Sequence, residues 1–178
     1  MRNFSLLSVG VAVLACLFAS ADAQDKQPPA KDPKAVVISY DPGAGGFIRK
    51  GEAPYLKIQA DGQVTVTGLH DGAKAQAKLA PKELADLLKF IVVEQKFFDL
   101  TEKKMNDAIK VAAANGPFIA IGGAGTSKIV VEADGRKHEV SFRAASAYAS
   151  AYPKVEVVPQ FVAIEKKLSD YAAAVKGK

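Results

Sequence analysis

Polar and apolar residues alternate along two neighbouring stretches, residues 55–59 and 63–67, which flank Ala60-Asp61-Gly62. The alternation assigns four residues to one face, namely Leu56, Ile58, Val64 and Val66. An Asp-Gly pair between such stretches favours a tight turn, because glycine reaches positive φ without a Cβ clash. The pattern therefore predicts an antiparallel hairpin with one buried face.

The same arrangement recurs later in the chain. Residues 127–132 and 136–142 flank a second Ala-Asp-Gly, Ala133-Asp134-Gly135, and predict a second hairpin. Asp-Gly hairpins are common and the flanking residues match poorly, so both duplication and chance explain the repeat. Two further strands are expected, at residues 35–40, ended by the turn signal Asp41-Pro42-Gly43, and at residues 118–121.

Apolar residues at steps of three and four predict three helices, at residues 81–98, 102–114 and 157–174. Pro81 suits the first turn of its helix, where the missing N–H is no loss. Thr101 is the expected N-cap of the second helix, because its hydroxyl can accept a backbone hydrogen bond. Residues 144–152 are predicted as either a short helix or a loop.

These elements predict one α+β domain at residues 35–175. We expect an antiparallel sheet of about five or six strands with two or three helices packed mainly on one face. The expected core consists of large apolar side chains: Ile58, Val64, Leu84, Leu88, Ile91, Phe97, Phe98, Val131 and Phe161. Phe90, Val93 and Phe97 form a second apolar stripe on the first helix.

The N-terminal residues 1–23 have the pattern of a signal peptide. Arg2 gives a positive start, residues 6–18 are almost wholly apolar, and Ala21-Asp22-Ala23 is a small-x-small cleavage site. The apolar run is too short for a membrane span. The pattern therefore predicts an exported protein, periplasmic or secreted, without a transmembrane span in the mature chain. Residues 24–34 are polar and proline-rich, which predicts a disordered leader.

An alternative localisation depends on Cys16, the single cysteine of the chain. Val13-Leu14-Ala15-Cys16 is similar to the box at which bacterial lipoproteins are cut and acylated, so the alternative is a lipoprotein anchored at Cys16. Cleavage after Ala23 instead leaves about 155 residues, a size that suits one domain. That product has no cysteine, which excludes disulfides and thiolate chemistry.

The net charge of +5 is spread over isolated basic residues and pairs, with acidic residues between them. A nucleic-acid surface shows a denser basic stripe, so nucleic acid is not expected as a partner. The two histidines, His70 and His138, are expected to be exposed polar residues. His70 beside Asp71 lacks a third catalytic member, and no ligand spacing suits zinc. We therefore predict no catalytic residue, no metal and no cofactor.

Two glycine-rich loops, Gly43-Ala44-Gly45-Gly46 and Gly122-Gly123-Ala124-Gly125, lack the spacing of nucleotide-binding motifs and precede strands. The simplest interpretation is that their glycines allow turns or bulges at a sheet edge. A sharper hypothesis is that both loops lie together at one rim and contact a ligand or partner. Its candidate contact residues are Gly43, Gly45, Gly46, Gly122, Gly123 and Gly125.

Four motifs follow one another along the chain: Pro54-Tyr55-Leu56-x-Ile58, Asp61-Gly62-x-Val64, Lys96-Phe97-Phe98-Asp99-Leu100, and Asp134-Gly135-x-x-His138. In this order they resemble exported bacterial α+β domains of unknown function, over roughly residues 36–168. The resemblance implies a small secreted α+β domain. It brings no catalytic or binding residue with it.

The absence of a catalytic motif together with the export pattern favours a noncatalytic binding or interaction domain of the bacterial cell envelope. Its partner is expected to be a protein, a peptide or a glycan, contacted through an exposed sheet face or the glycine-loop rim. Two alternatives remain: an inhibitor-like or chaperone-like module, and an unrecognised envelope hydrolase.

Overall fold

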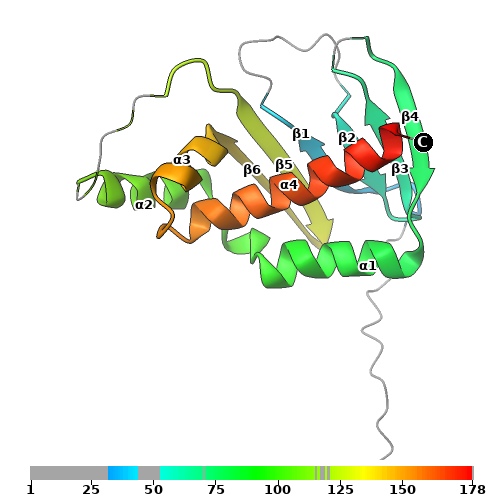
Figure 1. The fold of residues 1–178 in the computed structure, drawn as a ribbon. Coiled ribbons are helices and arrows are strands. Elements are labelled where there is room, and N and C mark those ends of the chain that lie inside the picture. Colours follow the sequence, from blue (N-terminus) through cyan, green and yellow to red (C-terminus); the bar gives the residue numbers. More distant parts are fainter. Residues whose placement is uncertain are drawn as a thin grey trace, which may run out of the picture.

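The fold is a single antiparallel sheet with helices beside it, as predicted for an α+β domain (Figure 1). The computed structural model describes residues 32–43, 53–69, 71–114, 116, 119 and 121–177. Within these residues six strands pair in the order β4-β3-β2-β1-β5-β6. Their bounds are Val36–Asp41 for β1, Leu56–Gln59 for β2, Gln63–Thr67 for β3, Lys74–Lys78 for β4, Thr126–Ala133 for β5 and Arg136–Arg143 for β6.

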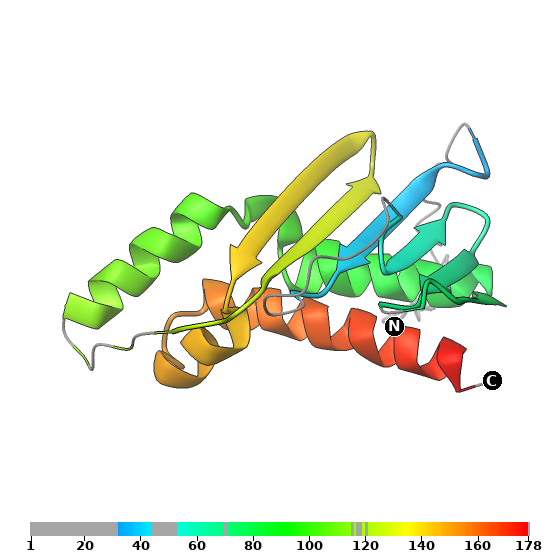
Figure 2. The ribbon, with the colours of Figure 1, turned by 90° about the horizontal axis from the view of Figure 1, so that it is seen from above.

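Four α-helices occur in the described part of the chain, one more than the two or three expected. They are α1 (Pro81–Lys89), α2 (Glu102–Ala114), α3 (Ala145–Ala151) and α4 (Val157–Lys176). The additional helix is α3, which lies within residues 144–152, the segment predicted as either a short helix or a loop. The long helix α4 runs across the sheet in Figure 1, and in the view from above it lies to one side of the strands (Figure 2).

The core lies between one face of the sheet and the helices. Along β5 the residues Ser127, Ile129, Val131 and Ala133 are buried, whereas Thr126, Lys128 and Glu132 of the alternate positions are exposed. From α4, the apolar residues Phe161, Ile164 and Leu168 are fully buried against this face. Of the predicted core residues all are buried except Phe98, which is half-buried and packs at the edge of the core.

Both predicted hairpins are present, but their identical Ala-Asp-Gly sequences form different turns. At β5–β6 the two-residue turn has positive φ at both Asp134 (53°) and Gly135 (71°), the geometry of a type I′ turn. At β2–β3 all three residues form the loop, and only Gly62 has positive φ (83°). The difference in turn geometry gives no support to a structural duplication.

Two expectations about strands differ from the structure. The edge strand β4 was not predicted, because its apolar residues are only Ala75 and Ala77 and its remaining residues are Lys and Gln. A strand at residues 118–121 was predicted, yet Ile119 and Ile121 belong to no strand and are only half-buried. Phe118 and Ala120 lie outside the described residues.

The first predicted helix does not continue to residue 98. After α1 the chain forms a π-helical segment, Phe90–Glu94, and then Lys96 takes the left-handed conformation with a φ of 52°. A left-handed residue ends a helix and redirects the chain. The redirection brings Phe97 into the core, whereas Val93 of the predicted second stripe is 62% exposed.

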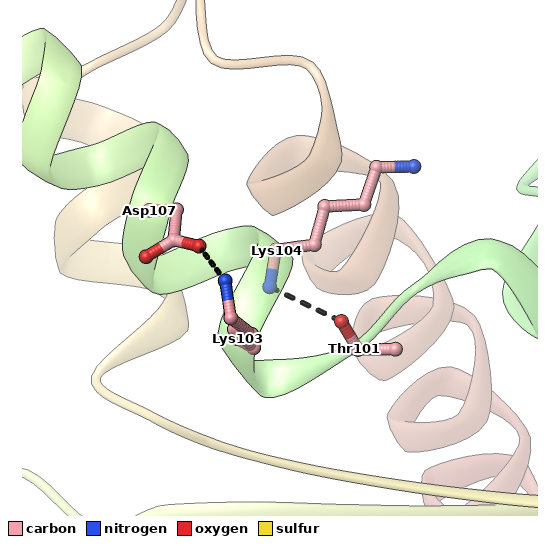
Figure 3. Close-up of polar contacts among 4 residues, drawn as sticks. All are labelled: Thr101, Lys103, Lys104 and Asp107. Atoms are coloured by element: carbon pink, nitrogen blue, oxygen red, sulfur yellow. Dashed lines mark hydrogen bonds and ion pairs between the residues drawn. The ribbon is translucent and has the colours of Figure 1, made fainter.

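Helix α2 has the predicted bounds and the predicted cap. The Thr101 hydroxyl accepts a hydrogen bond of 3.1 Å from the backbone N–H of Lys104 (Figure 3). One turn further on, Lys103 and Asp107 form an exposed ion pair at the favourable spacing of four residues (Figure 3). Local signals therefore mark where this helix begins.

The predicted signal peptide, Cys16 and residues 24–31 of the predicted leader lie outside the described residues. The end of that leader and the first residue of the predicted domain are described: the Pro33 carbonyl accepts a hydrogen bond of 3.0 Å from the N–H of Asp61, and the Ala35 carbonyl accepts one from the N–H of Ala60. In the described part of the chain, no helix combines the length and hydropathy that a membrane span requires.

Candidate functional site

Gly43, just after β1, and Gly125, just before β5, lie with their backbones in direct contact. A Cβ on Gly125 would lie 2.3 Å from the carbonyl carbon of Gly43, and one on Gly43 would lie 2.6 Å from the carbonyl carbon of Gly125. Such distances leave no room for any side chain, so the close approach requires glycine at both positions. We call this pair the glycine junction.

The junction joins one residue from each predicted glycine loop. Gly122 and Gly123 have open space around them and take no part in the contact. Gly45 and Gly46 lie outside the described residues. Contact of these six glycines with a ligand or partner stays a prediction.

Ser127 connects the glycine junction to α4. Its Oγ accepts a hydrogen bond of 3.0 Å from the backbone N–H of Gly43, and its hydroxyl donates to the carboxylate of Glu165. At 8% exposure, Ser127 is the only buried polar side chain in the described part of the chain. A buried hydroxyl needs such partners, since an unpaired one is costly.

The Glu165 carboxylate is half-buried on the side of α4 that faces the sheet. Burial raises its pKa above the ordinary range, and the hydrogen bond from Ser127 offsets part of this rise. The ion pairs among the described residues involve other acids, and none of those residues pairs with Glu165. Among the described residues, the Glu165 carboxylate is therefore stabilised by the hydrogen bond from the Ser127 hydroxyl and by no cationic side chain.

Tyr40 and Ser169 extend this polar network between the sheet and α4. The Tyr40 hydroxyl lies 3.2 Å from Ser169 Oγ, one helical turn after Glu165. Burial is the main cause that raises the pKa of Tyr40 to about 12, and the nearby Glu165 charge adds to it. The hydroxyl of Tyr40 is therefore neutral over the whole physiological pH range.

A cavity of about 260 Å³ opens beside the glycine junction. Among the residues that the structure describes, Glu165 is the only charged one that lines it, and the other lining residues are glycines, alanines and serines, among them Ala124, Ala145, Ser146 and Ala147. We call this cavity the Glu165 pocket. Pockets for whole small-molecule ligands usually span about 300–1,000 Å³, so the Glu165 pocket suits an end group of a larger ligand.

A second cavity, of about 240 Å³, lies between α2, β6 and α3. It is lined by both an acid, Glu102, and a base, Arg143, each of them exposed. Arg143 Nε donates a hydrogen bond of 3.2 Å to the carbonyl of Ala124 and so braces the loop before β5. Because one acid and one base line this cavity and both are exposed to solvent, its charges do not favour one class of ligand over another.

His138 is not the exposed residue that was expected. Its Nε2 lies 2.7 Å from the carbonyl oxygen of Leu100, and its half-buried ring packs against Phe97 and Phe98, with ring centroids 5.4 and 6.0 Å away. Its role is to join β6 to the segment before α2. His70 lies outside the described residues, and among the described residues no three His, Cys, Asp or Glu side chains gather in a way that could hold a metal.

Sequence reasoning identified Gly43 and Gly125 but missed Ser127 and Glu165. One signal for Ser127 was available, because it shares the alternation of Ile129 and Val131 and so occupies a core-facing position with a polar side chain. Glu165 has no comparable local signal, since one acid beside an apolar stripe is ordinary in a surface helix.

Comparison of this chain with protein-family models, with curated proteins and with solved structures finds no match.

Proposed function

We propose that this chain is an exported, noncatalytic binding domain of the bacterial cell envelope and that the Glu165 pocket is its binding site. One observation carries the proposal: a half-buried carboxylate without a cationic partner in the described part of the chain lines a cavity with small walls. Burying a charge costs free energy, and proteins accept that cost at functional sites more often than elsewhere. The export of the chain rests on the signal-peptide pattern.

The way the pocket is built supports a binding role. Ser127 belongs to a paired strand and Glu165 to a long helix, so both side chains are held by regular structure. The glycine junction and the hydrogen bond from Arg143 hold the loop just before β5, which also lines the pocket. A site on rigid elements loses little conformational entropy when it binds.

One observation favours the envelope hydrolase as a second candidate. Ser127 donates to Glu165, a carboxylate with a raised pKa, and a serine beside a base is the starting arrangement of nucleophilic catalysis. Against this, Ser127 is only 8% exposed, and its oxygen already accepts a hydrogen bond from Gly43. These contacts suit a hydroxyl that positions Glu165 better than one that attacks a substrate.

The binding role is tested by filling the pocket. Ala147 is exposed and lines the Glu165 pocket, so Ala147→Phe blocks the cavity without disturbing the core. The matched control is Ser150→Phe, on the same helix but outside the pocket lining. We expect co-sedimentation with the cell-envelope fraction to be lost in Ala147→Phe and retained in Ser150→Phe.

Equal retention of both variants in the envelope fraction would contradict a binding role of the pocket. Turnover of an envelope substrate by the purified protein, abolished in Ser127→Ala, would replace the proposal by the hydrolase. If the bound partner is an enzyme and binding lowers its activity, the domain is inhibitor-like. If the partner is an unfolded chain and binding prevents its aggregation, the domain is chaperone-like.

A further inference from the structure

The chemistry of the Glu165 pocket indicates which end group it takes. We propose that it binds a primary ammonium group on a short alkyl stem, such as a lysine-type side chain of a peptide; this rests on the proposed function. The described residues that line the pocket are one acid, Glu165, and otherwise glycine, alanine and serine, and they surround a volume of about 260 Å³. These three features match the charge, the stem and the size of such a group.

The charge of the ligand follows from the surroundings of Glu165. Its carboxylate receives a hydrogen bond from Ser127, and a carboxylate offers about four acceptor positions, so most of its acceptor capacity remains. Burial disfavours the ionised form of the carboxylate, and a positive charge at contact distance favours it. A cationic ligand therefore offsets the cost of burial. An anionic ligand would meet repulsion from Glu165, the only charged residue among the described ones that line the pocket.

The hydrogen bond that Glu165 already accepts favours an ammonium group over a guanidinium group. Guanidinium binds carboxylate best through two parallel hydrogen bonds to its two oxygens. The hydrogen bond from Ser127 already uses one of the acceptor positions of the Glu165 carboxylate. An ammonium group acts as a compact charge with three donors and does not need both oxygens at once.

The walls suit an unbranched stem. Four alanines line the cavity, namely Ala124, Ala144, Ala145 and Ala147, and apart from Glu165 the described residues of the lining are all glycine, alanine or serine. Burying the methylenes of a stem against alanine side chains is favourable, because apolar surface leaves water. Together with Glu165, these alanines favour a ligand that carries a short apolar stem and a charged end.

The test is an NMR titration of the ¹⁵N-labelled protein with three probes of matched size at equal ionic strength: n-butylammonium, n-butanol and butyrate. We expect the amides of Gly43, Gly125 and Ser127 to shift with n-butylammonium and to stay in place with the other two. Glu165→Gln keeps the shape of the side chain and removes its charge. We expect it to weaken n-butylammonium binding by about tenfold or more, the usual loss for a hydrogen bond to a charged group.

The outcomes separate this inference from the proposed function. Equal shifts with n-butanol, or binding that Glu165→Gln leaves intact, would overturn the ammonium ligand. If n-butylammonium shifts no amide but Ala147→Phe abolishes envelope binding, the ammonium ligand is overturned and the pocket remains a binding site. If n-butylammonium shifts no amide and Ala147→Phe binds the envelope like the native protein, both the ammonium ligand and the binding role of the pocket are overturned.

Discussion

The hydroxyl of Ser127 on β5 donates a hydrogen bond to the carboxylate of Glu165 on α4. The same oxygen accepts the N–H of Gly43 at 3.0 Å, so one buried serine connects the end of β1, the start of β5 and the long helix. This relationship places a carboxylate beside the glycine junction, and the proposed binding site depends on it.

The first prediction concerns Ser127→Ala. Because the hydrogen bond from Ser127 stabilises the ionised carboxylate, its removal is expected to raise the pKa of Glu165 further. The measurement is a pH titration of the Glu165 side-chain carboxyl carbon by NMR. Ser169→Ala, one turn along the same helix, is the control and should leave the midpoint nearly unchanged. A midpoint that falls or stays constant in Ser127→Ala would contradict the assigned hydrogen bond.

The second prediction concerns stability and pH. The pKa of Glu165 is raised in the folded chain, so the folded state holds this proton more tightly than the unfolded state. The stability that comes from this proton is present below the ordinary glutamate pKa of about 4.3 and is lost as pH rises through the folded pKa. Glu165→Gln should therefore be more stable than the native protein at neutral pH and lose this advantage in acid.

Urea denaturation at a series of pH values measures this difference. The control is Glu132→Gln, which removes an exposed carboxylate from β5 and should change stability by no more than about 0.5 kcal/mol. A Glu165→Gln variant that is less stable than the native protein at neutral pH would show that the carboxylate is stabilising, contrary to this account.

The third prediction concerns the glycine junction. A Cβ on Gly125 would lie 2.3 Å from backbone atoms of Gly43, so Gly125→Ala must force the two chains apart. We expect it to cost about 1–3 kcal/mol of unfolding free energy, as overpacked positions do. Gly122→Ala is the matched control: open space surrounds Gly122 and its φ is not positive, so its effect should stay within about 0.5 kcal/mol. Equal unfolding midpoints for the two variants would refute the junction.

The fourth prediction separates two adjacent aromatic residues. Phe97 is fully buried, so Phe97→Ala is expected to cost about 3–5 kcal/mol. Phe98 is half-buried and covered partly by the guanidinium of Arg136, 4.0 Å from its ring centroid, so Phe98→Ala should cost only about 1–2 kcal/mol. Chemical denaturation of both variants gives the comparison, and a larger loss for Phe98→Ala would mean that their places in the core are exchanged.

The elements that could be predicted from the sequence are those with local signals. Asp-Gly turns between alternating stretches identify both hairpins, and the Thr101 cap with its apolar period gives α2 its bounds. Strand β4 lacks such a signal, because Ala75 and Ala77 bury too little surface to mark a strand; its place is set by pairing with β3. The predicted first helix ends before the left-handed Lys96, and the next residue, Phe97, is fully buried by residues distant in the sequence, so no local signal marks this end.

The candidate site could be predicted only in part, for the same reason. The glycines at residues 43 and 125 are visible as loop signals, and their contact follows from the pairing of β1 with β5. The link from Ser127 to Glu165 forms only when α4 packs on the sheet, so no local pattern announces it. The raised pKa of Glu165 likewise comes from burial by residues distant in the sequence.

The most direct test of the account is the pKa of Glu165 with and without n-butylammonium, followed on its side-chain carboxyl carbon. The account predicts that saturating n-butylammonium lowers this pKa, because an ammonium group beside the carboxylate favours its ionised form. n-Butanol in sodium chloride of equal ionic strength should leave the titration curve unchanged. If the curve with n-butylammonium coincides with the curve without it, Glu165 recognises no ammonium group and the account is contradicted.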